Sequence, residues 1–345
     1  MAMFSRSPKV RVEVAAKTDL GRTRDHNEDR FLVADLTRNS ASLPPGARQQ
    51  EIGPRGTLLV VADGMGGAAA GELASQMATD TIYAHLAKTW HEDDATPQRF
   101  AYRLKEAVEA ANASIHAHAK AHPEVRGMGT TTTAAGVLND HLYLTQVGDS
   151  RAYLIRGSEA HQLTKDQSLM QRLVEAGELT EEEAAQSERR NIILQALGPD
   201  PKVKVDLTHQ ELRRGDILVL CSDGLSGQVK KEEIAKIVTS APDLATAADK
   251  LIALANERGG PDNITVVVAR FDGEGLRFSG SGTPEDVGHQ VYPLIDTETS
   301  TEPVPVYKGS RPPVPRSKDA RSTRTIVLAA LAVLAALAWY LTRAK

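Results

Sequence analysis

The sequence predicts an α+β protein in which antiparallel sheets are covered by helices. Short segments rich in Val, Ile, Leu, Thr and Tyr recur between Gly, Asp and Asn residues, as is typical of β-strands. Many of these segments are separated only by hairpin-sized gaps, such as residues 139–140, which favours antiparallel pairing. The two longest helical patterns follow the third strand together, so strand and helix do not alternate regularly.

The elements follow from local patterns. The strand pattern predicts strands over 11–18, 29–35, 57–63, 131–138, 141–148, 151–157, 216–223 and 263–271. Apolar residues recurring three and four positions apart predict helices over 72–88, 98–120, 167–177, 230–239 and 243–257. Residues 38–56 carry no such pattern and are expected to form a long surface loop.

The chain divides into three zones. Residues 1–272 hold the periodic segments and are expected to form one folded domain. Residues 273–324 are rich in Pro, Ser, Thr and Gly and have too few apolar residues to build a core, so a flexible linker is expected there. Residues 325–342 form an uncharged apolar run.

This last run predicts a transmembrane helix. It has the length needed to cross a hydrocarbon core of about 30 Å, and Trp339 and Tyr340 lie at its far end, where interfacial aromatic residues are expected. Basic residues are more numerous before the run than after it. The positive-inside rule therefore predicts a single-pass protein of the cell membrane whose N-terminal bulk faces the cytoplasm. A buried Ala-rich helix is the alternative.

Composition excludes some functions. The chain has 345 residues, a net charge of −4 and only 4% aromatic residues, so no nucleic-acid partner is expected. Cys221 is the single cysteine, so no internal disulfide can form, and a reducing compartment fits. Its place in an apolar strand segment predicts a buried core residue.

Carboxylates recur at the ends of the predicted strands. One Asp-Gly after a strand is ordinarily a turn signal, but several separate strand ends in this domain carry an acidic residue. These are Asp63, Asp149, Asp223, Asp262 and the pair Glu28-Asp29. Carboxylates that share a site repel one another unless cations neutralise them. The pattern therefore predicts a cation site.

The chemistry of these residues indicates which cation. Carboxylate and carbonyl oxygens suit Mg²⁺ or Mn²⁺, while zinc-type Cys/His spacing and a Walker lysine loop are absent from the sequence. Two such ions bridged by one Asp can generate a hydroxide and hold a phosphoryl oxygen. Gly64, next to Asp63, lets the backbone approach an ion closely.

Ordered motifs show a resemblance to a known family. The segments "RTRDHNEDRF", "VVADGMGG", "MGTTTTAAGV", "VGDSRAYLIR", "LTKDQS", "LCSDGL" and "GPDNITVVV" occur in this order. In order and approximate spacing they resemble the bacterial branch of the PPM-type metal-dependent Ser/Thr protein phosphatases, the protein phosphatase 2C family, over about residues 8–272. The resemblance implies a sandwich of two antiparallel sheets flanked by helices, in four α-β-β-α layers, with the metals at one end.

The resemblance also implies ligands for two ions. Asp63 would bridge both Mn²⁺ or Mg²⁺ ions, and the carbonyl of Gly64 would bind one of them. Asp223 and Asp262 would ligate the other. In the implied mechanism, a metal-bridging hydroxide attacks the phosphorus of phosphoserine or phosphothreonine in line, without a covalent enzyme intermediate.

Four further residues match positions of the family. Glu28 would lie close to the metals, and Asp29 would hold a water. Adjacent strand residues point to opposite faces, so both could reach one ion only if the backbone bent. Asp149, together with Asp223, matches the site of a third, weaker metal. Arg24 matches the phosphate-binding arginine, a role suited to its bidentate guanidinium.

The sequence departs from the family's motifs at two positions. Residues 165–198 match a flap beside the site, but Gln167 stands where the family often has His, which bears on substrate choice. Met65 follows Gly64 where many eukaryotic members have His. Because Met cannot donate a proton, the general acid is not identified from the sequence.

The expected function is hydrolysis of phosphoserine and phosphothreonine in proteins. Expected partners are phosphoproteins, including Ser/Thr kinases and their substrates at the membrane. A catalytically silent, membrane-tethered binding or sensor module of the same fold is the alternative. A metal-dependent nuclease or polymerase fits less well, because the acidic chain has no basic groove.

Overall fold

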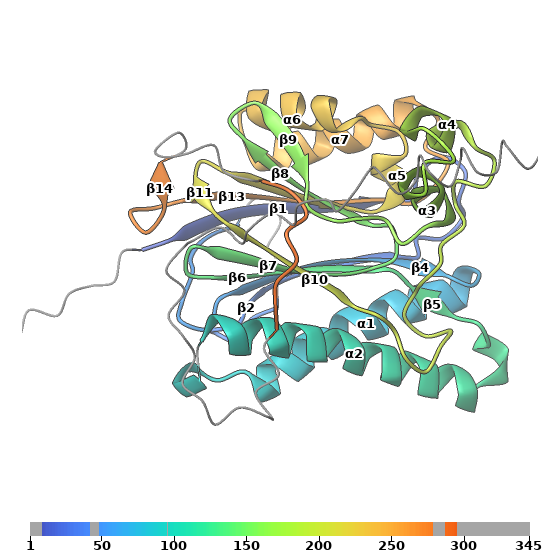
Figure 1. The fold of residues 1–345 in the computed structure, drawn as a ribbon, viewed down its shortest axis with the longest axis horizontal. Coiled ribbons are helices and arrows are strands. Elements are labelled where there is room, and N and C mark those ends of the chain that lie inside the picture. Colours follow the sequence, from blue (N-terminus) through green and yellow to red (C-terminus); the bar gives the residue numbers. More distant parts are fainter. Residues whose placement is uncertain (1–8, 42–47, 95, 279–286, 295–345) are drawn as a thin grey trace, which may run out of the picture. The chain divides into compact units, whose positions relative to one another are not determined.

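The computed structural model describes residues 9–41, 48–94, 96–278 and 287–294. Two β-sheets pack face to face in this part of the chain, and helices cover the outer face of each sheet (Figure 1). The expected four-layer α-β-β-α architecture is therefore confirmed.

All strand pairs within the two large sheets are antiparallel. The first sheet has the order β3-β1-β13-β12-β8-β9, formed by β3 (Arg48–Glu51), β1 (Arg11–Asp19), β13 (Ile264–Asp272), β12 (Ile217–Cys221), β8 (Arg151–Arg156) and β9 (Glu159–Gln162). The second has the order β10-β7-β6-β4-β2, formed by β10 (Asp206–Glu211), β7 (His141–Val147), β6 (Thr132–Leu138), β4 (Thr57–Met65) and β2 (Asp29–Asp35). The short β5 (Gly129–Thr130) pairs with β4, and β11 (Arg213–Arg214) pairs in parallel with β14 (Arg277–Phe278).

The helices lie on two sides of this sandwich (Figure 1). The second sheet is covered by α1 (Ala68–Thr89) and α2 (Pro97–Ala121). The first is covered by α6 (Lys231–Ser240) and α7 (Leu244–Glu257). The shorter helices are η1 (Glu92–Asp94), η2 (Pro123–Val125), α3 (Leu169–Glu175), α4 (Glu181–Gln186) and α5 (Asp223–Ser226).

The pleat of β4 shows how the layers are built. Leu58, Val60 and Ala62 point into the core beneath α1 and α2, while Leu59 and Val61 point into the core between the sheets. Both sets are fully buried, with 0% exposure. Because successive strand residues alternate between faces, Asp63 continues the set that faces the other sheet.

Three polar edge strands were missed by the sequence pattern. β3 lies in the expected surface loop 38–56, and it pairs with β1 through residues such as Gln50, opposite Val12. β9 and β10 lie at sheet edges. Edge strands are not apolar on both faces, so their sequences "RQQE", "EAHQ" and "DLTHQE" resemble loops. The predicted strand 216–223 also ends early, because Asp223 begins α5 after Ser222.

The described part of the expected linker packs on the domain. His209 N–H donates to the Gln290 carbonyl at 2.9 Å, and Tyr292 N–H donates to the Leu207 carbonyl at 2.9 Å. The Tyr292 ring lies edge-on against Tyr143 at 5.3 Å. Residues 287–294 therefore extend the second sheet beyond β10, which differs from the expected free linker because Tyr292 and Leu294 pack against the core.

The rest of the linker and the expected membrane segment 325–342 lie outside the described residues. Among the residues that are described, no helix combines the length and apolar character needed to cross a membrane.

Candidate metal centre

Two aspartates meet at the centre of the acidic end. Asp29, the first residue of β2, is paired directly with Asp63 of β4 in the antiparallel register. Phe31 and Val33 of β2 lie in the core between the sheets, so Asp29 projects to the same inner face as Asp63. Sheet pairing therefore brings together two carboxylates that lie far apart in the sequence.

The side chain of Glu28, the residue before Asp29, lies on the side of the strand that faces α1. Its carboxylate is so close to Gly71 of α1 that a methyl group there would overlap it. A methyl group on Gly64 would overlap the Gly71 carbonyl and lie 2.6 Å from the Glu28 carbonyl oxygen. Glycine at 64 and 71 is thus required for α1 to approach β4, while Glu28 and Asp29 face opposite ways, as the pleat predicts.

Asp149 and Asp223 complete the acidic group around Asp63. Burial raises the pKa of Asp63 well above its ordinary value, and the charges of Asp29, Asp223 and Asp149 raise it further. Burial also raises the pKa of Asp149 to about 7, with a further contribution from Asp223. Burial and the charge of Asp262 raise the pKa of Asp223, whereas a hydrogen bond with Asp63 opposes the rise. The folded chain holds these negative charges at an energetic cost.

Unpartnered oxygen atoms indicate what would relieve that cost. Asp29 Oδ1, Asp149 Oδ1 and Asp223 Oδ1 are buried and accept no hydrogen bond, although buried polar atoms are nearly always paired. Among the described residues, no three acidic, His or Cys side chains already converge closely around one point. The oxygen-rich donor set nevertheless fits Mg²⁺ or Mn²⁺, which would pair these atoms and neutralise the charges.

Arg24 stands at the rim of this group. Its Nη2 donates to Asp262 Oδ2 at 2.8 Å, and the Arg24 side chain is 51% exposed. This hydrogen bond to Asp262 raises the pKa of Arg24 further, and burial opposes it. The guanidinium is therefore both charged and reachable from solvent, as binding of a phosphate group requires.

Three supporting residues were not identified from the sequence. Ser222 Oγ donates to Asp29 Oδ2 at 2.7 Å. Asn263 Oδ1 accepts from Glu28 N–H at 2.8 Å, and its Nδ2 donates to the Leu20 and His26 carbonyls. Thr131 Oγ1 accepts from Asp63 N–H at 3.1 Å, and Thr131 N–H donates to the Asp63 carbonyl at 2.8 Å. Each belongs to a quoted motif, but a motif does not reveal which distant group its side chain contacts.

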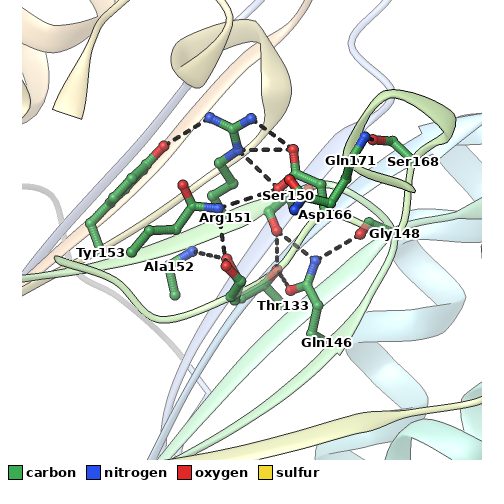
Figure 2. Close-up of polar contacts among 12 residues, drawn as sticks. Thr133, Gln146, Gly148, Ser150, Arg151, Ala152, Tyr153, Asp166, Ser168 and Gln171 are labelled. Carbon is green, nitrogen blue, oxygen red and sulfur yellow. Dashed lines mark hydrogen bonds and ion pairs between the residues drawn. The ribbon is translucent and has the colours of Figure 1, made fainter. Parts of the chain in front are cut away.

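A cation beside the acidic group is already paired. Figure 2 shows the Arg151 guanidinium between Asp166 and the Tyr153 hydroxyl, and Nη2 lies 2.7 Å from Asp166 Oδ2. Arg151 lowers the pKa of Asp149 and of Asp223, but burial dominates both shifts. Because Asp166 balances the charge of Arg151, this arginine does not neutralise the acidic group alone.

The predicted flap joins the site at both of its ends. Gln167 N–H donates to the Gly148 carbonyl at 2.9 Å, and Leu197 forms backbone hydrogen bonds with Thr130 in both directions. Between them lie α3, α4 and an isolated bridge between Ser168 and Ile193. The flap is thus tied to the turns that carry Asp149 and support Asp63.

The fold and site together define an α-β-β-α sandwich protein with a buried acidic centre suited to divalent cations. Residues 48–260 match the family described as "Protein phosphatase 2C". The chain is 42% identical to the serine/threonine protein phosphatase PstP of Mycobacterium tuberculosis, over 74% of this chain and 44% of that protein. It is 37% identical to the serine/threonine phosphatase stp of Listeria monocytogenes, over 74% of this chain and 94% of that protein.

A solved structure with bound metal has a similar fold. The catalytic domain of PstP in complex with two manganese ions is 40% identical, with a TM-score of 0.62 over 76% of this chain and 99% of that one. The chain belongs to the protein phosphatase 2C family. It spans less than half the length of the full PstP protein that it matches.

Proposed function

We propose that the chain is a metal-dependent protein-serine/threonine phosphatase. The observation that carries the proposal is the set of three buried, unpartnered carboxylate oxygens, on Asp29, Asp149 and Asp223, beside a solvent-accessible arginine in a member of this family. The named phosphatase activities of the relatives support it.

Four residues would hold two divalent cations: Asp63, Gly64 through its carbonyl, Asp223 and Asp262. When bound, Mn²⁺ or Mg²⁺ supplies Lewis acidity and activates water at this end of the sheets. The two manganese ions in the PstP structure support this assignment.

The remaining residues would position the substrate and the outer ligands. Arg24 would release Asp262 and bind two oxygens of the phosphate group. Asp29 and Glu28 would accept hydrogen bonds from water, each on its own face of the strand. Asp149, with Asp223, would hold a third, weaker ion.

The test is hydrolysis of a phosphothreonine peptide by the full chain, with Mn²⁺ and with excess EDTA. Asp223→Asn replaces a charged oxygen by an amide of the same shape. Asp80→Asn makes the same change at an exposed position of α1 and is the matched control. We expect activity that requires both the metal and Asp223 and is unaffected in the control.

A folded protein that binds Mn²⁺ but never hydrolyses the peptide would contradict the proposal. That outcome would favour the silent binding or sensor module of the same fold.

We also propose a membrane-tethered arrangement. In it, residues 1–272 with the flap 165–198 form the catalytic domain, residues after 294 serve as the tether, and residues 325–342 cross the membrane. The uncharged run and the excess of basic residues before it support this topology. Substrates would then be phosphoproteins near the cytoplasmic face, including Ser/Thr kinases.

Protease protection tests the topology. In sealed spheroplasts, a tag after residue 345 is expected to be digested from outside, while the phosphatase domain stays protected. A tag that is digested only from the cytoplasmic side, or full-length protein in the soluble fraction, would contradict it.

A further inference from the structure

Gln167 forms hydrogen bonds through both its backbone and its side chain at the base of the flap. Its backbone N–H donates to the Gly148 carbonyl at 2.9 Å, and its Oε1 accepts from Gly148 N–H at 2.9 Å. Its Nε2 donates to Asp206 Oδ2 at 3.0 Å. Its carbonyl accepts from Leu194 N–H at 2.7 Å. One residue thus joins the β7–β8 turn, the edge strand β10 and the returning end of the flap.

The turn that Gln167 holds carries Asp149. Gly148 has a φ of +98°, and a methyl group there would lie 2.7 Å from Thr131 Cβ. Residue 148 must therefore be glycine, and the turn has no side chain at this position that could stabilise it. Gln146 supports the turn from one side, since its Nε2 donates to the carbonyls of Gly148 and Ser150 (Figure 2). The Gly148 N–H is instead paired with Gln167.

The orientation of the Asp149 side chain depends on how this turn is held. Asp149 is only 6% exposed, and its Oδ1 has no hydrogen-bond partner. The carboxylate accepts a hydrogen bond from the backbone N–H of Asp149 itself, so the direction of the side chain depends on the backbone of the turn.

The chemistry at position 167 requires an amide. Oε1 accepts from Gly148 N–H, while Nε2 donates to Asp206 Oδ2 at 3.0 Å and to the Lys204 carbonyl at 3.5 Å. The two ends of a glutamine side chain supply both the acceptor and the donor. Leucine has a similar size but supplies neither. Glutamate keeps the acceptor but sets a negative charge against Asp206.

We propose that Gln167 is a positioning residue that holds the Asp149 turn and the returning flap segment in one register, so that divalent-cation binding and flap order depend on each other. Asp149 would hold the cation, and Gln167 would act through Asp149. The inference deepens the proposed phosphatase site and rests on it.

Hydrogen exchange tests the linkage without any activity assay. In metal-free Gln167→Leu full chain, we expect exchange of the Gly148 and Leu194 amides to accelerate together by about tenfold or more, the effect of one net hydrogen bond. The Leu194 amide bonds only to the backbone of residue 167, which the substitution retains, so its acceleration reports the coupling. Gln171→Leu, the same change on α3 where the amide contacts Glu175 at 3.4 Å, should leave both amides unchanged.

Calorimetric titration with Mn²⁺ provides the second measurement. We expect the weakest Mn²⁺-binding phase to weaken about tenfold in Gln167→Leu and the tighter phases to stay within twofold. The Mn²⁺ concentration for half-maximal turnover should shift by the same factor, with kcat at saturating Mn²⁺ changed less than the KM for metal. A lower melting temperature with unchanged Mn²⁺ binding would overturn the proposal, since a merely structural role predicts that result.

A pair of compensating substitutions tests whether the hydrogen bonds of the Gln167 side chain are responsible. Gln167→Glu alone should behave like Gln167→Leu, because the introduced carboxylate faces Asp206. Adding Asp206→Asn supplies an amide donor opposite that carboxylate, which still accepts from Gly148 N–H. The double variant should return exchange and Mn²⁺ binding to within about twofold of the wild type.

Failure of this rescue, while Gln167→Glu and Gln167→Leu are impaired and folded, would contradict the hydrogen-bond network. An inactive wild type would refute the proposed phosphatase, whereas exchange and calorimetry would still test the role of Gln167.

Discussion

The two ends of the sandwich use the same residue type in opposite ways. At the end formed by Asp29, Asp63 and Asp149, buried carboxylates crowd together with raised pKa values and unpartnered oxygens. At the other end, Asp216 is fully buried, yet it accepts from Arg156 Nη2 at 2.8 Å and from Arg213 N–H at 2.7 Å. The strand β12 connects the two, since Asp216 precedes it and Asp223 follows it.

The difference lies in where the positive charge comes from. A buried carboxylate is tolerated when a cation and hydrogen-bond donors surround it. The far end contains its cations as arginines, which also pair Asp272 with Arg214 at 3.6 Å and Glu211 with Arg213 at 3.1 Å. At the acidic end, Arg24 pairs with Asp262, and the proposed divalent cations would supply the rest of that charge. One end of the sandwich thus neutralises its buried carboxylate with arginines of the chain, whereas the other leaves carboxylate oxygens unpartnered.

The largest effect is expected for Asp63→Asn. Removing the central carboxylate should lower kcat by about a thousandfold or more, since bound metal contributes several kcal/mol to the transition state. The metal-free variant should unfold at the same temperature as the wild type or higher, because one of the crowded charges is gone. Phosphopeptide kinetics and metal-free thermal unfolding check this, and a variant that is both inactive and destabilised would contradict the comparison.

The far end should respond in the opposite way. Asp216→Ala removes the partner of a largely buried arginine and should lower the free energy of unfolding by about 3–5 kcal/mol. The kcat of the folded fraction should stay near the wild-type value. Urea unfolding and kinetics on the same preparation separate the two quantities, and a specific loss of kcat would refute the division of roles.

Mn²⁺ should stabilise the folded protein only by binding at the acidic end. Mn²⁺ at a hundredfold excess over its dissociation constant should add about 2.7 kcal/mol to the free energy of unfolding, and EDTA should reverse the gain. The gain should persist in Asp216→Ala and largely vanish in Asp63→Asn. Equal gains in both variants, measured by thermal shift, would show that Mn²⁺ binds elsewhere.

The smallest effect concerns an exposed ion pair between α6 and the C-terminal end of α7. Glu233 on α6 contacts both Arg258 Nη atoms, at 2.7 and 2.8 Å. Hydrogen bonding to Arg258 lowers the pKa of Glu233 to about 2. A lowered folded pKa adds stability above the unfolded value of about 4.5, and this stability is lost as pH falls toward 2.

Because the pair is exposed to solvent, Glu233→Gln should lower the melting temperature by about 2 °C or less at pH 7. The difference should shrink as the pH falls from 4.5 to 2. A difference that grows toward low pH would contradict the assigned pKa.

Much of the fold could be predicted from local pattern. The strands with apolar faces, such as β2, and the long amphipathic helices, such as α7, lie where their patterns predicted them, because burial imposes its period directly on the residues. The polar edge strand β10 and the segment 287–294 could not be predicted in this way. Their pairing depends on which edge lies open in the assembled sheet, and no local period reports that.

The candidate residues for the chemistry could be listed from the amino-acid sequence alone, because an apolar strand that ends on Asp63 or begins at Asp29 can be recognised from its own composition. Which of these groups meet is a matter of tertiary structure. Antiparallel pairing set Asp29 beside Asp63 and turned Glu28 toward α1. Loops that approach one another gave Asn263 and Gln167 partners from distant segments. Hydrogen bonds between such segments depend on sheet register and on the close approach of layers, and these are properties of the folded chain alone.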